Sequence, residues 1–264
     1  MQLRNILAFL RDFAPMDLAE DWDNVGLLIG AETDKVESVL TCLTLTSDVA
    51  AEAVECGAQL VVTHHPILFR AVQQITDATT EGQMLLDLIR AGISVYSPHT
   101  SYDSASTGIN SQLAEALSLS DVSPLRPVAD EDVVSGLGSG RYGDLPEPVS
   151  LSEFVERVKA ALRIEHTWLV GDTAQSVSRV GIACGAAAEF MRDARLAGCE
   201  VLLTGEARFH ACLEARSLGI ALVLPGHYAT ERHAMESLAG VLQERFPELS
   251  VSASESETDP IRWV

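Results

Sequence analysis

The hydrophobic positions of the chain form two patterns: short unbroken apolar runs, and longer stretches with helical spacing. "LVVT" at 60–63 and "VLLT" at 201–204 are runs of the kind that strands buried in a sheet require. Between such runs, apolar residues recur every three or four positions, as in "LRNILAFLRDF" at 3–13, which predicts an amphipathic helix. The alternation of these patterns predicts an α/β protein with largely parallel sheets flanked by helices.

The two halves of the chain resemble each other. Segment 50–69 aligns with segment 191–210, and segment 92–99 aligns with segment 219–226, in the same order along the chain. In the first pair, both segments are typical of a helix that ends near a glycine and is followed by a strand ending in threonine. We therefore expect two similar α/β lobes that arose by internal duplication.

The predicted boundary between the lobes lies in the middle of the chain. Segment 128–150 is rich in glycine, serine, proline and acidic residues, which predicts a loop or domain junction. The first lobe is expected to span residues 1–127 and the second residues 128–264. Within the second lobe, residues 227–264 are expected to pack back toward the first.

The junction contains a G-x-G-x-x-G pattern at Gly138, Gly140 and Gly143. A dinucleotide-binding loop needs this pattern between a buried strand and a helix. Here "DLPEP" follows, and prolines spaced in this way disfavour a helix. The pattern therefore does not predict a nucleotide cofactor.

Composition narrows the classes of function. The 264 residues include 38 acidic and 18 basic side chains, giving a formal charge of −20, which disfavours long-range attraction to nucleic acid or anionic membranes. The five cysteines form no C-x-x-C pair and are expected to be small buried residues. No signal peptide or membrane-spanning apolar run is recognisable, so we expect a cytoplasmic protein.

Histidines concentrate in four segments that follow predicted strands. Five of the seven histidines lie in "THHP" (63–66), "PHTSYD" (98–103), "TGEARFH" (204–210) and "PGHYATE" (225–231). Carboxyl ends of parallel strands meet at one edge of a sheet, which is where α/β proteins place their ligand sites. Metal coordination is the commonest reason for such a concentration of histidine.

Spacing within these segments favours metal ligands. His227 and Glu231 are four residues apart, so a helix would bring both to one face, and His99 and Asp103 share that spacing. A structural alternative exists for each pair, because an H-x-x-x-E pair often lies on a helix surface without a metal. Their convergence in equivalent segments of a duplicated unit favours the metal site.

The adjacent pair His64 and His65 predicts two ions rather than one. Neighbouring side chains of an extended segment diverge, so each imidazole would bind a different ion, although such a pair can also simply end a strand. Imidazole and carboxylate ligands without thiolates suit manganese, iron, zinc or cobalt in a catalytic site. Glu231 is a candidate to bridge two divalent ions with a hydroxide between them, which favours hydrolysis.

Six motifs together resemble the Nif-three-like family, also called GTP cyclohydrolase I type 2 homologues or dinuclear metal centre hexameric proteins. The resemblance covers nearly the whole chain. The motifs are "WDNVGLLIG" (22–30), "LVVTHHPILF" (60–69), "HTSYD" with a later "GIN" (99–110), "GSGRYGDLPEP" (138–148), "LLTGEARFH" (202–210) and "GHYATE" (226–231). The resemblance implies a homohexameric ring of subunits, each with two lobes and a two-metal site in the cleft between them. It also implies the short family form, without an inserted central domain.

Site residues follow from matching motifs. The resemblance implies five metal ligands, which are His64, His65, Asp103, His227 and Glu231. His99 is expected to orient a ligand or face the substrate, and Glu206 and His210 are acid–base candidates. Trp22, Asp23 and Asn24 are expected to form a structural turn with a buried aromatic ring.

Two positions depart from the family pattern. Thr44 stands where the family usually has an aspartate near the end of the first strand. "GAAAEF" at 185–190 replaces the expected glycine- and serine-rich turn. All five proposed ligands are present, so these departures bear on the walls of the site and on the choice of substrate.

The leading hypothesis is a dinuclear metal-dependent hydrolase. It would act on a nucleotide or another phosphorylated small molecule through a metal-bridging hydroxide. The alternative is a non-enzymatic hexameric ring that serves as a scaffold or handles metal ions and binds a protein or nucleic-acid partner. The acidic composition makes nucleic acid the less favoured partner, and no membrane partner is expected.

Overall fold

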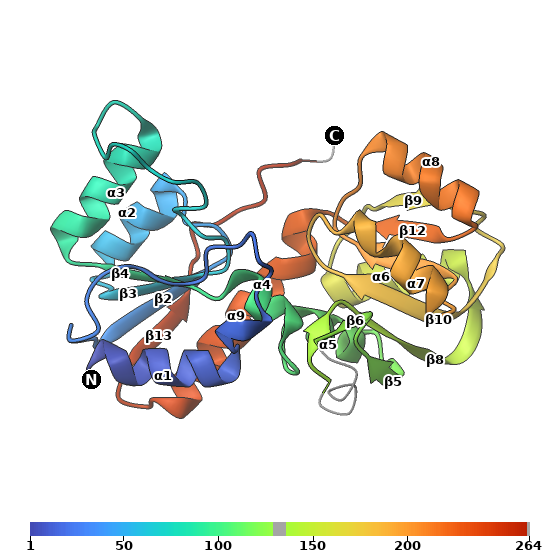
Figure 1. Cartoon of the computed structure of the whole chain (residues 1–264), viewed down its shortest axis with the longest axis horizontal. Helices are drawn as coiled ribbons and strands as arrows, with labels where there is room; N and C mark the ends of the chain where they lie inside the picture. Colours follow the sequence, from blue (N-terminus) through green and yellow to red (C-terminus); the bar gives the residue numbers. More distant parts are fainter. Residues whose placement is uncertain (129–135, 263–264) are drawn as a thin grey trace. The chain divides into compact units, whose positions relative to one another are not determined.

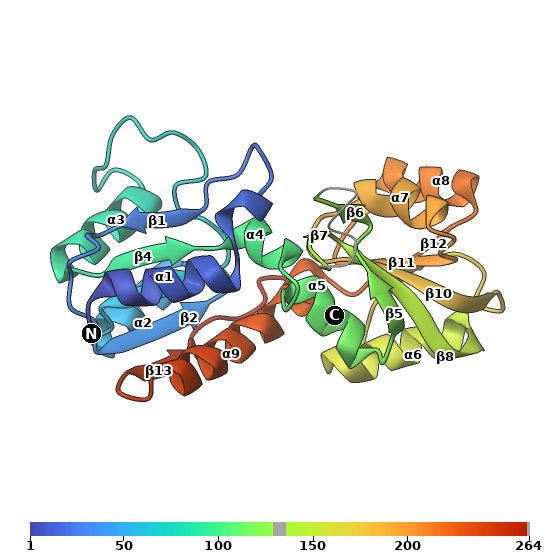
Figure 2. The same ribbon diagram turned by 60° about the horizontal axis from the view of Figure 1, so that its bottom comes forward.

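The computed structural model describes residues 1–128 and 136–262. The chain forms two compact units (Figures 1 and 2). The first unit comprises Met1–Tyr102 with Ala234–Pro260, and the second consists mainly of Asp103–His233. The predicted lobes, 1–127 and 128–264, follow the sequence repeat, and their common boundary stays a prediction. In the described ranges, no helix has both the length and the apolarity that crossing a membrane requires.

The first unit is built on a five-stranded sheet in which only one edge pairing is antiparallel. The strands, in spatial order, are β1 (Gly26–Ile29), β4 (Ser94–Ser97), β3 (Leu60–Thr63), β2 (Ser38–Cys42) and β13 (Ser250–Ala253). The covering helices are α2 (Ser47–Glu55) and α3 (Thr80–Ala91) on one face, with α1 (Leu3–Phe13) and the later part of α9 (His227–Arg245) on the other (Figures 1 and 2). The pairing of β13 with β2 adds residues 250–253 to the first sheet.

The hydrophobic pattern explains these elements. Leu3, Ile6, Leu7 and Leu10 of the helix α1 are fully or almost fully buried, which confirms the predicted helix. The helix α2 begins after Thr46, whose side chain accepts a hydrogen bond from the backbone of Val49, and Thr79 caps α3 in the same way. The helix α3 ends at Gly92, which has the left-handed backbone (φ 70°) that such a cap requires.

The second unit contains a six-stranded mixed sheet. Its strands, in spatial order, are β5 (Ser120–Ser123), β8 (Arg141–Ser150), β10 (Ser176–Ala183), β11 (Val201–Thr204), β12 (Ala221–Leu224) and β9 (Trp168–Val170). Its parallel pairings are those of β10 with β11 and of β11 with β12. The helices α7 (Met191–Leu196) and α8 (Phe209–Leu218) cover one face, and α5 (Ile109–Ala116) and α6 (Leu151–Leu162) cover the other (Figure 2).

The repeated segments occupy equivalent strands with the same register. Cys42 pairs with Thr63 at the end of β2 and β3, and Ala183 pairs with Thr204 at the end of β10 and β11. The next strands, β4 and β12, also pair in equivalent register. This agreement is consistent with internal duplication. The antiparallel strands β5, β8 and β9 lie outside the repeat, which is why the second sheet is less parallel than the pattern suggested.

The predicted junction at 128–150 is a loop only in part. Residues 129–135 lie outside the described residues, but Arg141–Ser150 forms the strand β8 inside the second sheet, so the loop prediction was wrong there. The pairing of β8 with β10 is interrupted between Asp144 and Val149, and Pro146 and Pro148 lie in this interruption. Prolines lack the N–H that a regular ladder needs, and the irregularity accommodates them. As the prolines predicted, no helix follows the glycines.

The glycines of this segment surround a buried arginine. The Arg141 side chain donates to the carbonyl groups of Gly138 and Gly140 at 2.5 and 2.6 Å, to that of Ala105 at 2.7 Å and to the Ser111 hydroxyl at 2.9 Å. Arg141 is only 2% exposed. Its burial lowers the pKa of the guanidinium to about 10, so the group remains charged at neutral pH. The pattern that resembles a phosphate loop therefore binds a cation of its own chain.

We expect Arg141→Met to destabilise the protein by about 3 kcal/mol, because it leaves several buried carbonyl groups without a donor. Urea unfolding monitored by circular dichroism measures the change. Arg157→Met is the control, since Arg157 makes a single exposed contact with Glu147 at 3.5 Å and its loss is expected to cost under about 0.5 kcal/mol. Equal stability of the two variants would contradict this role for Arg141.

Candidate metal centre

Three imidazoles gather at the carboxyl ends of two neighbouring strands in the first unit. His64 and His65 follow β3, and His99 begins α4 (His99–Ser104) directly after β4. Because β3 and β4 are parallel neighbours, their ends meet at the same edge. The ring centroids of His64 lie 5.1 Å from His65 and 5.2 Å from His99, and one ring nitrogen of each histidine lies within 4.8 Å of the others.

The main chain fixes the histidine pair. The backbone N–H of His64 donates to Cys42 at 3.0 Å, and that of His65 donates to Leu43 at 2.8 Å. The carbonyl of His64 accepts from the Ser97 hydroxyl at 2.6 Å. The fully buried His64 is therefore tied to the ends of both β2 and β4. This position was predicted from the strand pattern.

A buried carboxylate orients His99. Asp23 Oδ1 lies 2.7 Å from His99 Nδ1, and Asp23 Oδ2 accepts from the backbone N–H of Thr100 at 3.1 Å. Burial raises the pKa of Asp23, but the hydrogen bonds with His99 and Thr100 outweigh it and lower the pKa to about 2. The ionised carboxylate therefore accepts from Nδ1–H and presents Nε2 as the ligand or base atom of His99.

The sequence missed the role of Asp23 and misplaced Trp22. Trp22 is 60% exposed, so the expected buried aromatic was wrong. Its ring lies 5.8 Å from Phe69 and 6.0 Å from His99, so it belongs to an aromatic rim beside the imidazoles. The turn itself is present, because the N–H of Asp23 donates to Glu20. No local signal pairs Asp23 with His99, which lies 76 positions away.

A second donor set lies in the second unit. His227, the first residue of α9, has Nε2 3.1 Å from Glu231 Oε2 and Nδ1 3.2 Å from Glu206 Oε1. This confirms that His227 and Glu231 share a helix face. Burial lowers the pKa of His227, but the two carboxylates outweigh it and raise the pKa to about 9. Glu231 is only 3% exposed.

Asp103 lies beside a residue that the sequence did not single out. Cys184, which follows β10, places Sγ 3.2 Å from Asp103 Oδ1, and Asn110 donates to the Asp103 carbonyl at 3.1 Å. Burial, together with the charges of Asp103 and Glu231, raises the pKa of Cys184 well above its usual value. The neutral thiol can therefore donate to Asp103. Burial of this cysteine was predicted, whereas its polar contact was not.

Gly185 makes room for the Glu231 carboxylate. Its backbone is left-handed (φ 67°), and a Cβ at this position would collide with Glu231 Oε1 and lie 3.2 Å from His227 Nε2. A larger residue would therefore displace the carboxylate. Segment 185–190, which departs from the family pattern, keeps a glycine at position 185, where the His227–Glu231 pair requires one.

The two acid–base candidates, Glu206 and His210, lie in different surroundings. Glu206 contacts His227, so it belongs with the donor set. His210 is exposed on α8 with its ring beside Phe209, at a centroid distance of 5.7 Å. Its acid–base role stays a prediction.

Among the cysteines, Cys56 is exposed and Cys212 is half-buried, so the expectation of burial was wrong for these two.

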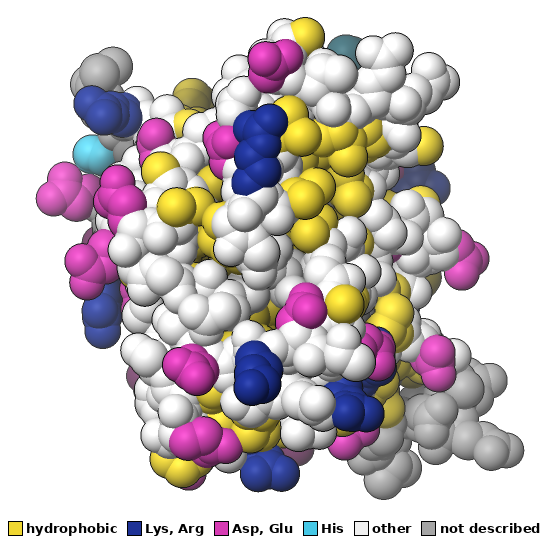
Figure 3. Space-filling model, turned by 90° about the vertical axis from the view of Figure 1, so that its left-hand side faces the viewer, with side chains coloured by type: hydrophobic (Ala, Val, Ile, Leu, Met, Phe, Trp, Pro, Cys, Tyr) yellow, Lys and Arg dark blue, Asp and Glu magenta, His cyan; other side chains and the backbone are white. Residues whose placement is uncertain are grey.

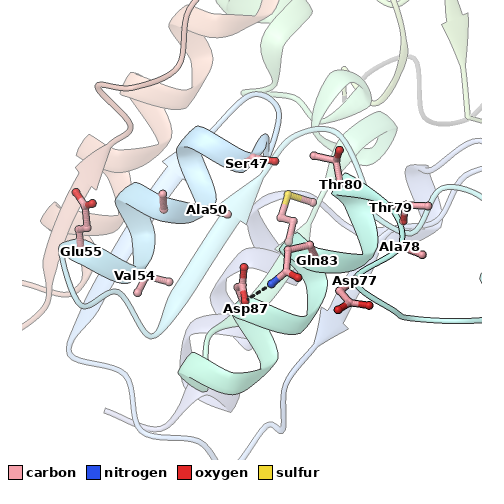
Figure 4. A pocket seen from close by; sticks show the side chains of 12 residues that line it. Ser47, Ala50, Val54, Glu55, Asp77, Ala78, Thr79, Thr80, Gln83 and Asp87 are labelled. Carbon is pink, nitrogen blue, oxygen red and sulfur yellow. Dashed lines mark hydrogen bonds between the residues drawn. The ribbon is translucent and has the colours of Figure 1, made fainter.

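A pocket adjoins His65 within the first unit. It has a volume of 450 Å³, and its lining includes Thr44, Thr46, Ile67 and Met84. A second pocket of 640 Å³ lies between α2 and α3 and shares Met84 with the first (Figure 4). Figure 3, which faces the left-hand side of Figure 1, shows apolar side chains exposed in several places among scattered charged ones. The first pocket offers hydroxyl and apolar groups directly beside a candidate ligand.

The donors present fit divalent metal ions. Ligand atoms that share one ion at about 2.1 Å each lie about 3 to 3.5 Å apart, which the 3.1 Å separation of His227 Nε2 and Glu231 Oε2 matches. Nitrogen and carboxylate oxygen donors suit manganese, iron, zinc or cobalt. The fold and these side chains define an α/β protein with candidate metal-binding clusters of histidine and glutamate at strand ends.

Comparison with known proteins identifies the family. The model of the Duf34/NIF3 (NGG1p interacting factor 3) family matches residues 1–260, and the chain belongs to this family. A Clostridium acetobutylicum protein named GTP cyclohydrolase 1 type 2 homolog is 30% identical, with 100% of this chain and 99% of that protein aligned. The Drosophila melanogaster NIF3-like protein 1 is 31% identical, over 98% of this chain and 88% of that one.

Solved structures confirm the fold. The structure of Staphylococcus aureus protein SA1388 matches with a TM-score of 0.90 and 26% identity, covering 100% of this chain and 99% of that one. A Bacillus cereus protein related to NIF3 matches with a TM-score of 0.92 at 23% identity, over 100% and 99% of the two chains, and this likeness concerns the fold alone.

We expect Glu231→Gln to lower the pKa of His227 in the metal-free protein. The wild-type imidazole should titrate near pH 9, and the loss of one carboxylate should move its pKa toward the ordinary value of 6.5. Nitrogen-15 NMR of the ring measures the titration. Glu165→Gln, which changes an exposed carboxylate outside the donor set, should leave His227 unchanged. An unaltered His227 titration in Glu231→Gln would contradict the pairing.

Gly185→Ala should separate Glu231 from His227 and lower the pKa of His227 in the same way. Gly57→Ala is a matched control, because Gly57 has the same φ of 67° but nothing within 4 Å of the place that a Cβ would take. Both variants should lose about 1 kcal/mol through backbone strain. Only Gly185→Ala should shift the His227 titration, and equal titrations in the two variants would rule out the steric role of Gly185.

Proposed function

We propose that the chain is a dinuclear metal-dependent hydrolase that acts on a nucleotide or another phosphorylated small molecule. The observation that carries the proposal is the His227–Glu231 pair, whose donor atoms lie 3.1 Å apart. The pair lies beside Gly185, where a Cβ would collide with the Glu231 carboxylate. The proposed metal ligands are His64, His65, Asp103, His227 and Glu231.

Bound divalent ions would supply Lewis-acid activation of water and of a phosphoryl or carbonyl oxygen. The chain's own residues would orient the reacting groups. Asp23 holds Nδ1 of His99, so that Nε2 can face the substrate or take a proton. Glu206 holds Nδ1 of His227 in the same manner, and the Cys184 thiol donates to Asp103. Each of these partners favours one orientation of a proposed ligand or base.

The pocket beside His65 has the size for a small substrate, and bound metal ions would have to attract the phosphate of such a substrate to this acidic chain. With a formal charge of −20, the protein needs bound cations to attract an anion. The 450 Å³ pocket lies within the usual size range of small-molecule sites. Its hydroxyl and apolar groups suit the uncharged part of such a molecule, whereas Glu81 in its lining would repel a phosphate. The relatives' name, GTP cyclohydrolase 1 type 2 homolog, points to the same broad class of substrate.

Metal content tests the proposal most directly. Protein purified without a metal-affinity tag should carry close to two transition-metal ions per chain by mass spectrometry. His65→Ala and Glu231→Ala should each reduce this content by at least half while the circular dichroism spectrum stays unchanged. His210→Ala and His166→Ala, which change exposed histidines, are the controls.

Hydrolysis of a panel of nucleotides and phosphoesters with added manganese completes the test. Turnover that is lost in Glu231→Ala would support the hydrolase. Metal content that is low in the wild type and unaffected by the substitutions would overturn it. Full metal content without turnover would favour the metal-handling alternative. This alternative would share the hexameric assembly that the resemblance implies and the cytoplasmic location expected from the sequence.

A further inference from the structure

Thr44 contacts the proposed ligand His65 from the end of the neighbouring strand. Thr44 Oγ1 lies 2.7 Å from His65 Nδ1, and Thr44 follows β2, the parallel neighbour of β3. We infer that Thr44, held in place by Glu257, is a positioning residue that directs Nε2 of His65 toward the metal. This inference rests on the proposed function for the identity of the bound group.

Nδ1 of the imidazole makes a polar contact in each of three histidines, His65, His99 and His227. Nδ1 of His99 lies 2.7 Å from Asp23, and Nδ1 of His227 lies 3.2 Å from Glu206. The contact between Thr44 Oγ1 and Nδ1 of His65 is the third of this kind. A hydrogen bond at Nδ1 fixes the ring and leaves Nε2 as the coordinating atom, which is how histidine ligands are usually supported. Of the three partners, only Thr44 is uncharged.

Glu257 fixes the backbone of Thr44. Its two carboxylate oxygens accept from the N–H of Leu43 at 2.9 Å and of Thr44 at 2.6 Å. On the other side, the Thr44 carbonyl accepts from the N–H of Thr46 at 3.0 Å. Both backbone polar groups of Thr44 are therefore engaged, and its Cβ has a fixed place relative to His65. Glu257 is itself buried, whereas Thr44 is exposed.

The segment that carries Glu257 is anchored in turn. Glu52 of α2 accepts from the Ser254 hydroxyl and from the N–H of Glu255 at 2.8 Å. The N–H of Ser254 donates to Thr41 of β2 at 2.8 Å. These contacts tie the turn after β13 to the strand and helix on either side of Thr44. The orientation of His65 thus depends on a chain of contacts within the first unit.

The partner's chemistry matters as well as its position. A hydroxyl both donates and accepts, whereas the aspartate that the resemblance leads one to expect at this position would only accept. With threonine, the ring can donate from Nδ1 without gaining a negative neighbour. His65 is therefore supported by a weaker acceptor than His99 and His227, and loss of the hydroxyl should leave the ring without a fixed orientation.

The test compares Thr44→Val with Thr44→Ser. Valine keeps the shape of threonine but removes the hydroxyl, so Thr44→Val should fold normally and bind Mn²⁺ or Zn²⁺ about tenfold more weakly by titration calorimetry. Serine keeps the hydroxyl and should retain wild-type affinity. Nitrogen-15 NMR of the metal-free protein should show a hydrogen bond at Nδ1 of His65 in the wild type and in Thr44→Ser, and its loss in Thr44→Val.

The two readouts separate this inference from the proposed function. If the wild type binds no metal, the hydrolase proposal fails, yet ring signals that change only in Thr44→Val would still support positioning by Thr44. Unchanged ring signals in Thr44→Val would overturn the inference, whatever happens to metal affinity. Glu257→Gln, which weakens the support of the Thr44 backbone, should alter the His65 signals in the same direction as Thr44→Val.

Discussion

The candidate site depends on the parallel pairing of β2, β3 and β4, and on the matching pairing of β10, β11 and β12. Parallel neighbours in register end at the same edge, so the residues that follow them must lie close together. His64 and His65 follow one strand and His99 follows its neighbour. In the second unit, Cys184, Glu206 and His227 follow three adjacent strands in the same way. A shift in register would scatter these side chains, and the buried apolar runs prevent such a shift.

The sequence predicted those features that depend on local periodicity. The buried strands, the amphipathic helix at 3–13 and the helical pairing of His227 with Glu231 all follow from spacing along the chain. The histidines at strand ends follow from the same reasoning, once parallel pairing is assumed. Each of these inferences uses neighbours within about one turn of helix or one strand, where sequence spacing determines geometry.

The groups that orient the candidate ligands could not be predicted, because they come from distant parts of the chain. Asp23 reaches His99, and Cys184 reaches Asp103, across 76 and 81 positions. The segment after Gly138 misled the prediction for a different reason. Its composition is that of a loop, but an irregularity in the pairing of β8 accommodates the prolines, and Arg141 uses the carbonyl groups that the glycines expose. The composition of the segment indicates only its local structural preference, and tertiary contacts determine that it forms a strand.

The contact between Glu257 and the loop after β2 also affects when the support of His65 can form during synthesis of the chain. A ribosome makes residues 43, 44 and 65 long before residue 257, so the nascent chain holds His65 without its final support. The first sheet also lacks β13 until that point. The imidazole can therefore gain this support only after residue 257 has been synthesised, and a chain that stops before that residue would carry the histidine pair without it.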